Sequence, residues 1–194
     1  NGSGVSMNTI HANNYKFYEE LNQIIQEEPT SAMDVETLGA LAAIGLEKGK
    51  PFEPDARMQK ILTDSAAVAN ATARAIIFSS RIKENYFYPN SAWNNPVVGL
   101  TGADYTLVRN GARLLDSRTY YFYYATIQTP AMVMKMVGAG SQYLMAFKGA
   151  DGQMLDGNKT YKLHLPPNIP VKSFWSLVVY DNQSRSMLQT DSPF

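Results

Sequence analysis

Aromatic and arginine side chains are the residues of this sequence best suited to bind a ligand. Aromatic residues fill positions 120–124 without a break, and the two tryptophans are Trp93 and Trp175. Sugar rings stack on aromatic faces, and a few polar groups then fix the ligand's orientation. We therefore expect a small-molecule or carbohydrate site drawn from these candidates: Trp93, Tyr105, Arg109, Arg113, Tyr120, Tyr124, His164, Trp175 and Tyr180. The alternative for Trp175 is packing in a hydrophobic core.

Nucleophilic catalysis finds little support in the sequence. The only histidines are His11 and His164, and a Ser-His-Asp triad would need one of them. Ser176 lacks the glycine-flanked elbow of the α/β-hydrolases. The chain has no cysteine, which excludes a thiolate nucleophile. The sequence therefore identifies no catalytic residue, and a hydrolytic role for the aromatic site stays open.

Metal and cofactor sites are not expected either. Asp151 and Asp156 lie in a glycine-rich loop with some of the oxygen ligands that Ca²⁺ prefers, but the loop lacks the ligand spacing of an EF-hand. Aspartate and glycine in loops are first of all turn formers. The sequence also contains no glycine-rich phosphate loop and no dinucleotide fingerprint. We expect no metal and no cofactor.

Composition limits the classes of partner. The chain has 194 residues, with 17 basic and 17 acidic side chains, so it lacks the positive charge that binds nucleic acid. No apolar stretch approaches the roughly 20 residues of a membrane span. Only 18% of residues are charged while 11% are aromatic, which is typical of a surface that is buried against a partner. A structural module that forms a homo-oligomer is therefore the alternative to a ligand-binding protein.

The first two thirds of the chain carry helical patterns. Apolar residues at helical spacing predict helices over 14–28, 34–44 and 54–83. Asn13 or Asn14 is the expected N-cap of the first helix, and Asp34 that of the second, which Gly45 closes in a left-handed conformation. Helical spacing continues over 104–115 and 117–128, with an alternating strand as the competing interpretation of the aromatic run.

Alternating patterns follow near residue 140. Strands are predicted over 142–148, 160–165 and 173–180. Asp-Gly turns follow the first strand, prolines end the second, and an Asp-Asn turn closes the third. Helices first and strands afterwards favour an α+β fold. We expect a mainly helical domain over 1–135 and, over 136–194, the first antiparallel strands of an incomplete β-sandwich.

Three motifs within residues 149–180 carry a family resemblance: Asp-Gly-x-x-Leu-Asp-Gly, Tyr-x-Leu-His-Leu-Pro and Phe-Trp-Ser-Leu-x-x-Tyr-Asp. This run resembles the start of the domain of unknown function 1214, and residues 14–128 are similar to the region joining it to its companion, the domain of unknown function 1254. The resemblance implies an immunoglobulin-like sandwich, a helical middle and a jelly roll, of which this chain would hold the middle and the first strands of the roll. It implies a bacterial protein that is periplasmic or secreted, and supplies no catalytic residue.

The ends of the chain suggest a fragment. It begins Asn1-Gly2-Ser3-Gly4 and stops soon after the predicted strand 173–180. Three strands make an unfinished sheet, so we expect the sheet to continue beyond Phe194. An unpaired edge and an apolar face would then make the isolated chain aggregate or remain molten.

Overall fold

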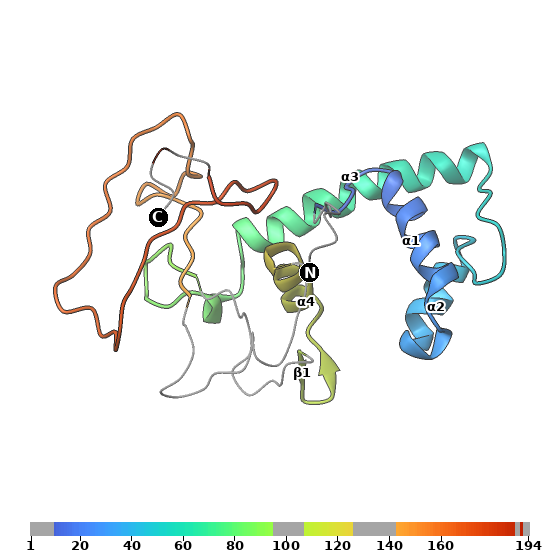
Figure 1. The fold of residues 1–194 in the computed structure, drawn as a ribbon, viewed down its shortest axis with the longest axis horizontal. Coiled ribbons are helices and arrows are strands. Elements are labelled where there is room, and N and C mark those ends of the chain that lie inside the picture. The colour runs from blue at the N-terminus through green and yellow to red at the C-terminus, as the bar shows by residue number, and fades with distance from the viewer. Residues whose placement is uncertain (1–9, 95–106, 126–142, 189–190, 192–194) are drawn as a thin grey trace. The chain divides into compact units, whose positions relative to one another are not determined.

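The computed structural model describes residues 10–94, 107–125, 143–188 and 191. These residues form four α-helices and one small antiparallel sheet, a combination that agrees with the predicted α+β class (Figure 1). The chain divides into two compact units, Asn1–Ala75 and Ile76–Phe194, and each is described by itself below.

The first predicted helix is confirmed as α1 (Lys16–Glu27). Asn14 lies just before it, and its side-chain Oδ1 accepts a hydrogen bond of 3.0 Å from the backbone N–H of Lys16. Ile25 is the buried residue of this helix, and only 1% of its surface is exposed. The 3₁₀ turn Thr30–Ala32 follows the helix directly.

The second predicted helix is confirmed as α2 (Val35–Ala42), with both expected caps. The Oδ2 atom of Asp34 accepts hydrogen bonds from the backbone N–H and the hydroxyl of Thr37, at 3.1 and 2.9 Å. Gly45 follows with φ of +89°, a conformation that glycine adopts without a Cβ penalty. Capping residues thus set both ends of α2, as the sequence predicts.

The third helix, α3 (Ala56–Phe78), is shorter than predicted at both ends. Asp55 caps its start, because its Oδ1 accepts a 2.7 Å hydrogen bond from the backbone N–H of Met58. After Phe78 the hydroxyl of Ser80 accepts from the backbone N–H of Ile82, and a short 3₁₀ helix, Lys83–Asn85, follows. Serine side chains that bond nearby backbone groups compete with the helix, which accounts for the earlier end.

Lys48 ties the loop after α2 to the C-terminal end of α1. Its Nζ donates to the carbonyls of Ile25, Gln26 and Glu28, at 3.3, 2.6 and 2.9 Å. These carbonyls have no intrahelical partner, and a cation at this end also complements the helix dipole. The Gln26 side chain adds to the connection, since its Oε1 accepts from the backbone N–H of Gly49 at 2.7 Å.

Replacing Lys48 by methionine is therefore expected to destabilise the first unit by about 1–2 kcal/mol, because charge-assisted hydrogen bonds to helix-end carbonyls are lost. Lys50→Met is the matched control. Lys50 forms an exposed ion pair with Glu47 at 2.7 Å, and such pairs contribute below about 1 kcal/mol. Hydrogen exchange of the α1 amides measures both variants; equal losses would contradict the role given to Lys48.

The predicted helix over 104–115 is wrong in its described part. Residues 108–113 form a hairpin, with β1 (Val108–Arg109) paired antiparallel to β2 (Ala112–Arg113). Asn110 and Gly111 connect the strands with φ of +52° and +74°. Two consecutive positive φ angles at Asn-Gly are the signature of a tight hairpin turn, and this local preference overrides the helical spacing.

The helix after the hairpin, α4 (Leu115–Ala125), agrees with the prediction over 117–128 in its described residues. It supplies the core of the second unit, where Tyr121 packs with the buried Leu107 and the half-buried Leu114. On the same helix, the ring of Tyr123 lies edge-on to Phe78, whose ring also meets that of Phe147. The centroid distances are 5.9 and 5.0 Å, in the range of favourable aromatic pairs.

The predicted turns after residue 148 are confirmed. The bridge between Lys148 and Met154 encloses the Asp151-Gly152 turn, and the bridge between Tyr180 and Met187 encloses the turn that begins at Asp181. Outside these bridges and one between Asn94 and Met145, the described residues after 143 form no strand ladder. The predicted strands over 142–148, 160–165 and 173–180 are therefore wrong in their described parts, because no neighbouring described strand completes their backbone hydrogen bonds.

Candidate functional site

Tyrosines gather around α4 in the second unit. Tyr120 is fully buried, and its phenol interacts electrostatically with those of Tyr86 and Tyr124. Tyr124 in turn interacts with Tyr143 and Tyr180. These five residues are called the tyrosine cluster below. Three of the nine candidate residues, Tyr120, Tyr124 and Tyr180, thus come together although 60 positions separate the first from the last in sequence.

Tyr86 and Tyr143 belong to the cluster but are not among the nine candidates predicted from the sequence. Tyr86 follows the 3₁₀ helix Lys83–Asn85, and its hydroxyl donates to the carbonyl of Ser80 at 2.9 Å. The density of aromatic residues after Asn85 is the one signal that could have selected it. Tyr143 carries no such signal, because only the folded chain brings it near Tyr124.

Unsatisfied polar atoms lie in the same unit as the cluster. The hydroxyl of Tyr120 and the Oδ1 atoms of Asn85 and Asn94 are buried without a hydrogen-bond partner among the described residues. The amide nitrogens of both asparagines are bonded: Asn85 donates to the hydroxyl of Ser80, and Asn94 to the carbonyl of Ala92. Buried polar groups are normally satisfied, so the Tyr120 hydroxyl stands out as a position where a polar ligand atom would be favourable.

The structure places the other described candidates on other segments of the second unit. Arg109 and Arg113 are exposed on the β1–β2 hairpin, and His164 is exposed in the segment after residue 160. Trp175 is 52% exposed, so it is not a core residue of this structure, and Trp93 is half-buried. Tyr105 lies outside the described residues. Within the described chain, no hydrogen bond, ion pair or ring contact connects Trp93, His164 or Trp175 to the tyrosine cluster.

Burial, together with the neighbouring phenols of Tyr143 and Tyr180, raises the pKa of Tyr124 to about 12. The pKa of Tyr120 is raised in the same direction, again chiefly by burial. Burial disfavours the charged phenolate, whereas an unfolded tyrosine ionises near pH 10.

Alkaline pH is therefore expected to destabilise the second unit. Because the folded pKa of Tyr124 lies above the unfolded value, its contribution to stability is complete below about pH 10 and is lost as pH rises towards 12. Denaturant unfolding followed by tryptophan fluorescence reports this unit, since both tryptophans lie in it. Tyr124→Phe should flatten the decline between pH 10 and 12; an unchanged slope would contradict the assignment.

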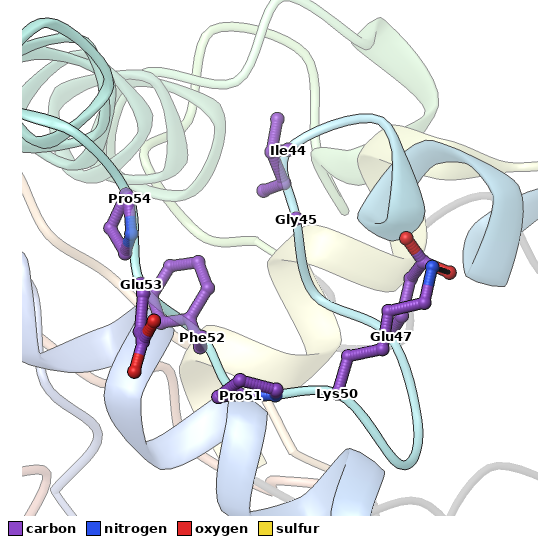
Figure 2. A pocket seen from close by; sticks show the side chains of 8 residues that line it. All are labelled: Ile44, Gly45, Glu47, Lys50, Pro51, Phe52, Glu53 and Pro54. Carbon is purple, nitrogen blue, oxygen red and sulfur yellow. Dashed lines mark hydrogen bonds and ion pairs between the residues drawn. The ribbon is translucent and has the colours of Figure 1, made fainter.

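Two open grooves occur in the described part of the chain. The first, about 420 Å³, lies in the first unit, where the loop from Ile44 to Pro54 curves around it; Figure 2 shows Glu47 and Lys50 on the opposite side from Phe52 and Glu53. The second, about 520 Å³, is lined by Lys83, Tyr86, Tyr88, Pro89, Asn90 and Ser91. Tyr86 connects this second groove to the tyrosine cluster.

A further candidate surface is apolar and lies on residues 173–180, called the apolar segment below. Phe174 is 79% exposed, and Leu177, Val179 and Tyr180 are each more than half exposed. No backbone hydrogen bond joins residues 172–178 to any other part of the described chain. Contiguous apolar surface of this kind marks an interaction site rather than a solvated face.

The described residues include neither a metal-binding cluster nor a membrane-spanning helix. There, no three aspartate, glutamate or histidine side chains come close enough together to coordinate a metal ion. None of the described helices combines the length and the hydropathy that crossing a bilayer requires.

Comparison with known families supports one part of the resemblance. No curated protein matches the chain. One family match includes the apolar segment and the turns at Asp151-Gly152 and at Asp181, and it does not extend to the helices before residue 140. Residues 140–194 are similar to the family described as "Protein of unknown function (DUF1214)".

Proposed function

We propose that this chain is a protein-interaction module whose apolar segment pairs with an extended strand of another polypeptide. One observation carries the proposal: residues 173–180 are uncharged, exposed and largely without backbone hydrogen bonds. A strand satisfies both needs of such a segment, because its backbone completes the hydrogen bonds and its side chains cover the apolar faces.

The composition of the segment favours a strand over other partners. It contains aromatic and β-branched residues, among them Phe174, Val178 and Tyr180, which are enriched in sheets. The absence of charge gives no basis for recognising phosphate or a charged peptide. Pairing of this kind also agrees with the proposed role of residues 136–194 as the opening strands of a jelly roll. The resemblance that suggests the roll supports an exported bacterial protein, and we include a periplasmic or secreted location in the proposal.

Peptide binding tests the proposal. A fluorescent peptide with the sequence of residues 172–181 should bind the chain saturably, with a rise in anisotropy. The control is the same peptide methylated at every backbone nitrogen, which keeps the side chains but removes the hydrogen-bond donors of both edges. The control should bind at least about tenfold more weakly, because strand addition depends on main-chain hydrogen bonds. Equal binding of the two peptides, or binding of neither, would overturn the proposal.

A small-molecule site at the tyrosine cluster is the second candidate function. The buried hydroxyl of Tyr120 favours it, because it lacks a partner among the described residues and interacts electrostatically with the phenols of Tyr86 and Tyr124. Tyr86 also lines the groove of about 520 Å³, where Lys83 and Asn90 offer a cation and an amide. Aromatic rings beside a few polar groups are suited to a neutral carbohydrate or another polyol.

Thermal shift measurements with mono- and disaccharides test this candidate, since a ligand that binds the native state raises its melting temperature. The expected result is a saturable shift that Tyr120→Phe removes and Tyr161→Phe retains. Tyr161 is a suitable control because it is exposed in the same unit. The absence of any shift with the unmodified chain, or an equal shift with Tyr120→Phe, would exclude the hydroxyl as a ligand contact.

A further inference from the structure

Residues of the turn that follows the apolar segment already form backbone hydrogen bonds with one of its two edges. The carbonyl of Val179 accepts from the backbone N–H of Leu188 at 3.0 Å, and the N–H of Asp181 donates to the carbonyl of Ser186 at 2.9 Å. Val179 and Asp181 therefore direct their backbone groups towards residues 186–188. In an extended strand the backbone groups of successive residues point to opposite edges.

The opposite edge is consequently formed by the even-numbered residues. Tyr180 pairs with Met187 without exchanging hydrogen bonds with it, so its own N–H and C=O point away from the turn. By the same alternation, the backbone groups of Phe174, Ser176 and Val178 share the edge with Tyr180 when the segment is extended. We call these four residues the free edge.

Charge selects the direction in which a second copy would pair. The uncharged stretch is bounded by Lys172 and Asp181. Hydrogen bonds from the backbone and side chain of Ser184 lower the pKa of Asp181, so its carboxylate is charged at neutral pH. A parallel pair would bring lysine beside lysine and aspartate beside aspartate. An antiparallel pair brings the Lys172 end of each copy to the Asp181 end of the other, which is the favourable arrangement.

Side chains select the register within that direction. Pairing between two free edges must place even residues opposite even residues. With Leu177 opposite itself, Phe174 faces Tyr180 of the second copy, and Trp175 faces Val179 of the second copy. Aromatic pairs and aromatic–β-branched pairs are among the stabilising cross-strand combinations. Shifting the centre to Ser176 would lose the aromatic pair and place two serines at the middle.

Resting on the proposed function above, we propose that the strand bound by this module is the same segment of a second copy of the chain. The two free edges pair antiparallel about Leu177, so that each copy contributes an identical set of residues to a closed two-fold interface. The residue pairs that exchange backbone hydrogen bonds between the two copies are then Phe174 with Tyr180 and Ser176 with Val178. Each pair occurs twice because the interface is two-fold symmetric.

Single-cysteine variants test both the partner and the register, since the natural chain has no cysteine to interfere. In the proposed register, two Leu177→Cys copies place their Cα atoms about 4.5 Å apart, within the range that a disulfide spans. In two Ser176→Cys copies the cysteines are offset by two residues along the paired strands. Their Cα atoms are then too far apart for a disulfide. Val68→Cys, at an exposed position on α3, measures disulfide formation by random collision.

Leu177→Cys should form a covalent dimer under mild oxidation at least about tenfold faster than either control, because only its thiols are aligned. Leu177 is 57% exposed, so the substitution is tolerated, and circular dichroism confirms that each variant is folded. Equal rates for Leu177→Cys and Ser176→Cys, or no rate above that of Val68→Cys, would overturn this proposal. If the peptide of residues 172–181 nevertheless binds in preference to its methylated form, strand pairing of this segment stands and only the register is wrong.

Discussion

Replacing Val178 by lysine is expected to weaken self-association of the chain by at least about tenfold, because lysine on a strand edge opposes edge-to-edge pairing. Val178 belongs to the free edge and is 43% exposed, so the substitution leaves the core of the second unit intact. In the proposed register each copy would bring its new ammonium group opposite Ser176 of the other. Light scattering over a dilution series measures the dissociation constant of each variant.

Val68→Lys is the matched control for this prediction. It makes the same change of residue and charge at a position on α3 that is 66% exposed. Its dissociation constant should equal that of the unmodified chain. Equal weakening by both variants would show that net charge alone controls association. If Val178→Lys does not weaken association, the free edge is not part of the interface.

Tyr120→Ala is expected to destabilise the second unit by about 3–5 kcal/mol, because a fully buried aromatic ring leaves a cavity that its neighbours fill only in part. Tyr120→Phe keeps the ring and removes only the hydroxyl, so it measures the contribution of the hydroxyl to stability. Without added ligand it should be neutral or stabilising by up to about 1 kcal/mol, since it removes a buried hydroxyl that lacks a partner among the described residues.

Urea unfolding measured by tryptophan fluorescence distinguishes the two variants, because Trp93 and Trp175 both report the second unit. A loss above about 1 kcal/mol for Tyr120→Phe would mean that the hydroxyl makes a hydrogen bond in the folded protein. In that case the argument for a ligand at this position would fail, although the packing role of the ring would remain.

Local signals predicted the helices of the first unit well. Asp34 and Gly45 set the ends of α2 because a side-chain cap and a glycine at positive φ act within a few residues. The hairpin at residues 108–113 was missed although its signal is also local: Asn110-Gly111 specifies a tight turn. The helical spacing of the surrounding apolar residues conceals the signal of this dipeptide.

Long-range structure was less accessible to sequence reasoning. Tyr120, Tyr124 and Tyr180 were selected for their chemistry, and the structure brings them together because Arg185 holds the turn after Tyr180 against α4. Its guanidinium donates to the carbonyl of Tyr123 at 3.3 Å, a contact that no pattern in the sequence indicates. Trp175, a candidate of the same chemistry, lies instead in the apolar segment, where about half of its surface is exposed.

Hydrogen exchange of the apolar segment, resolved by residue at two protein concentrations, tests directly whether the free edge pairs with a second copy of the chain. In dilute solution the amides of Phe174, Ser176 and Val178 should exchange nearly as fast as in an unstructured chain, because nothing in the described structure protects them. At high concentration these three amides should become protected, while those of Trp175 and Leu177, which point to the other edge, should remain fast. Protection already present in dilute solution, or rates independent of concentration, would contradict the account.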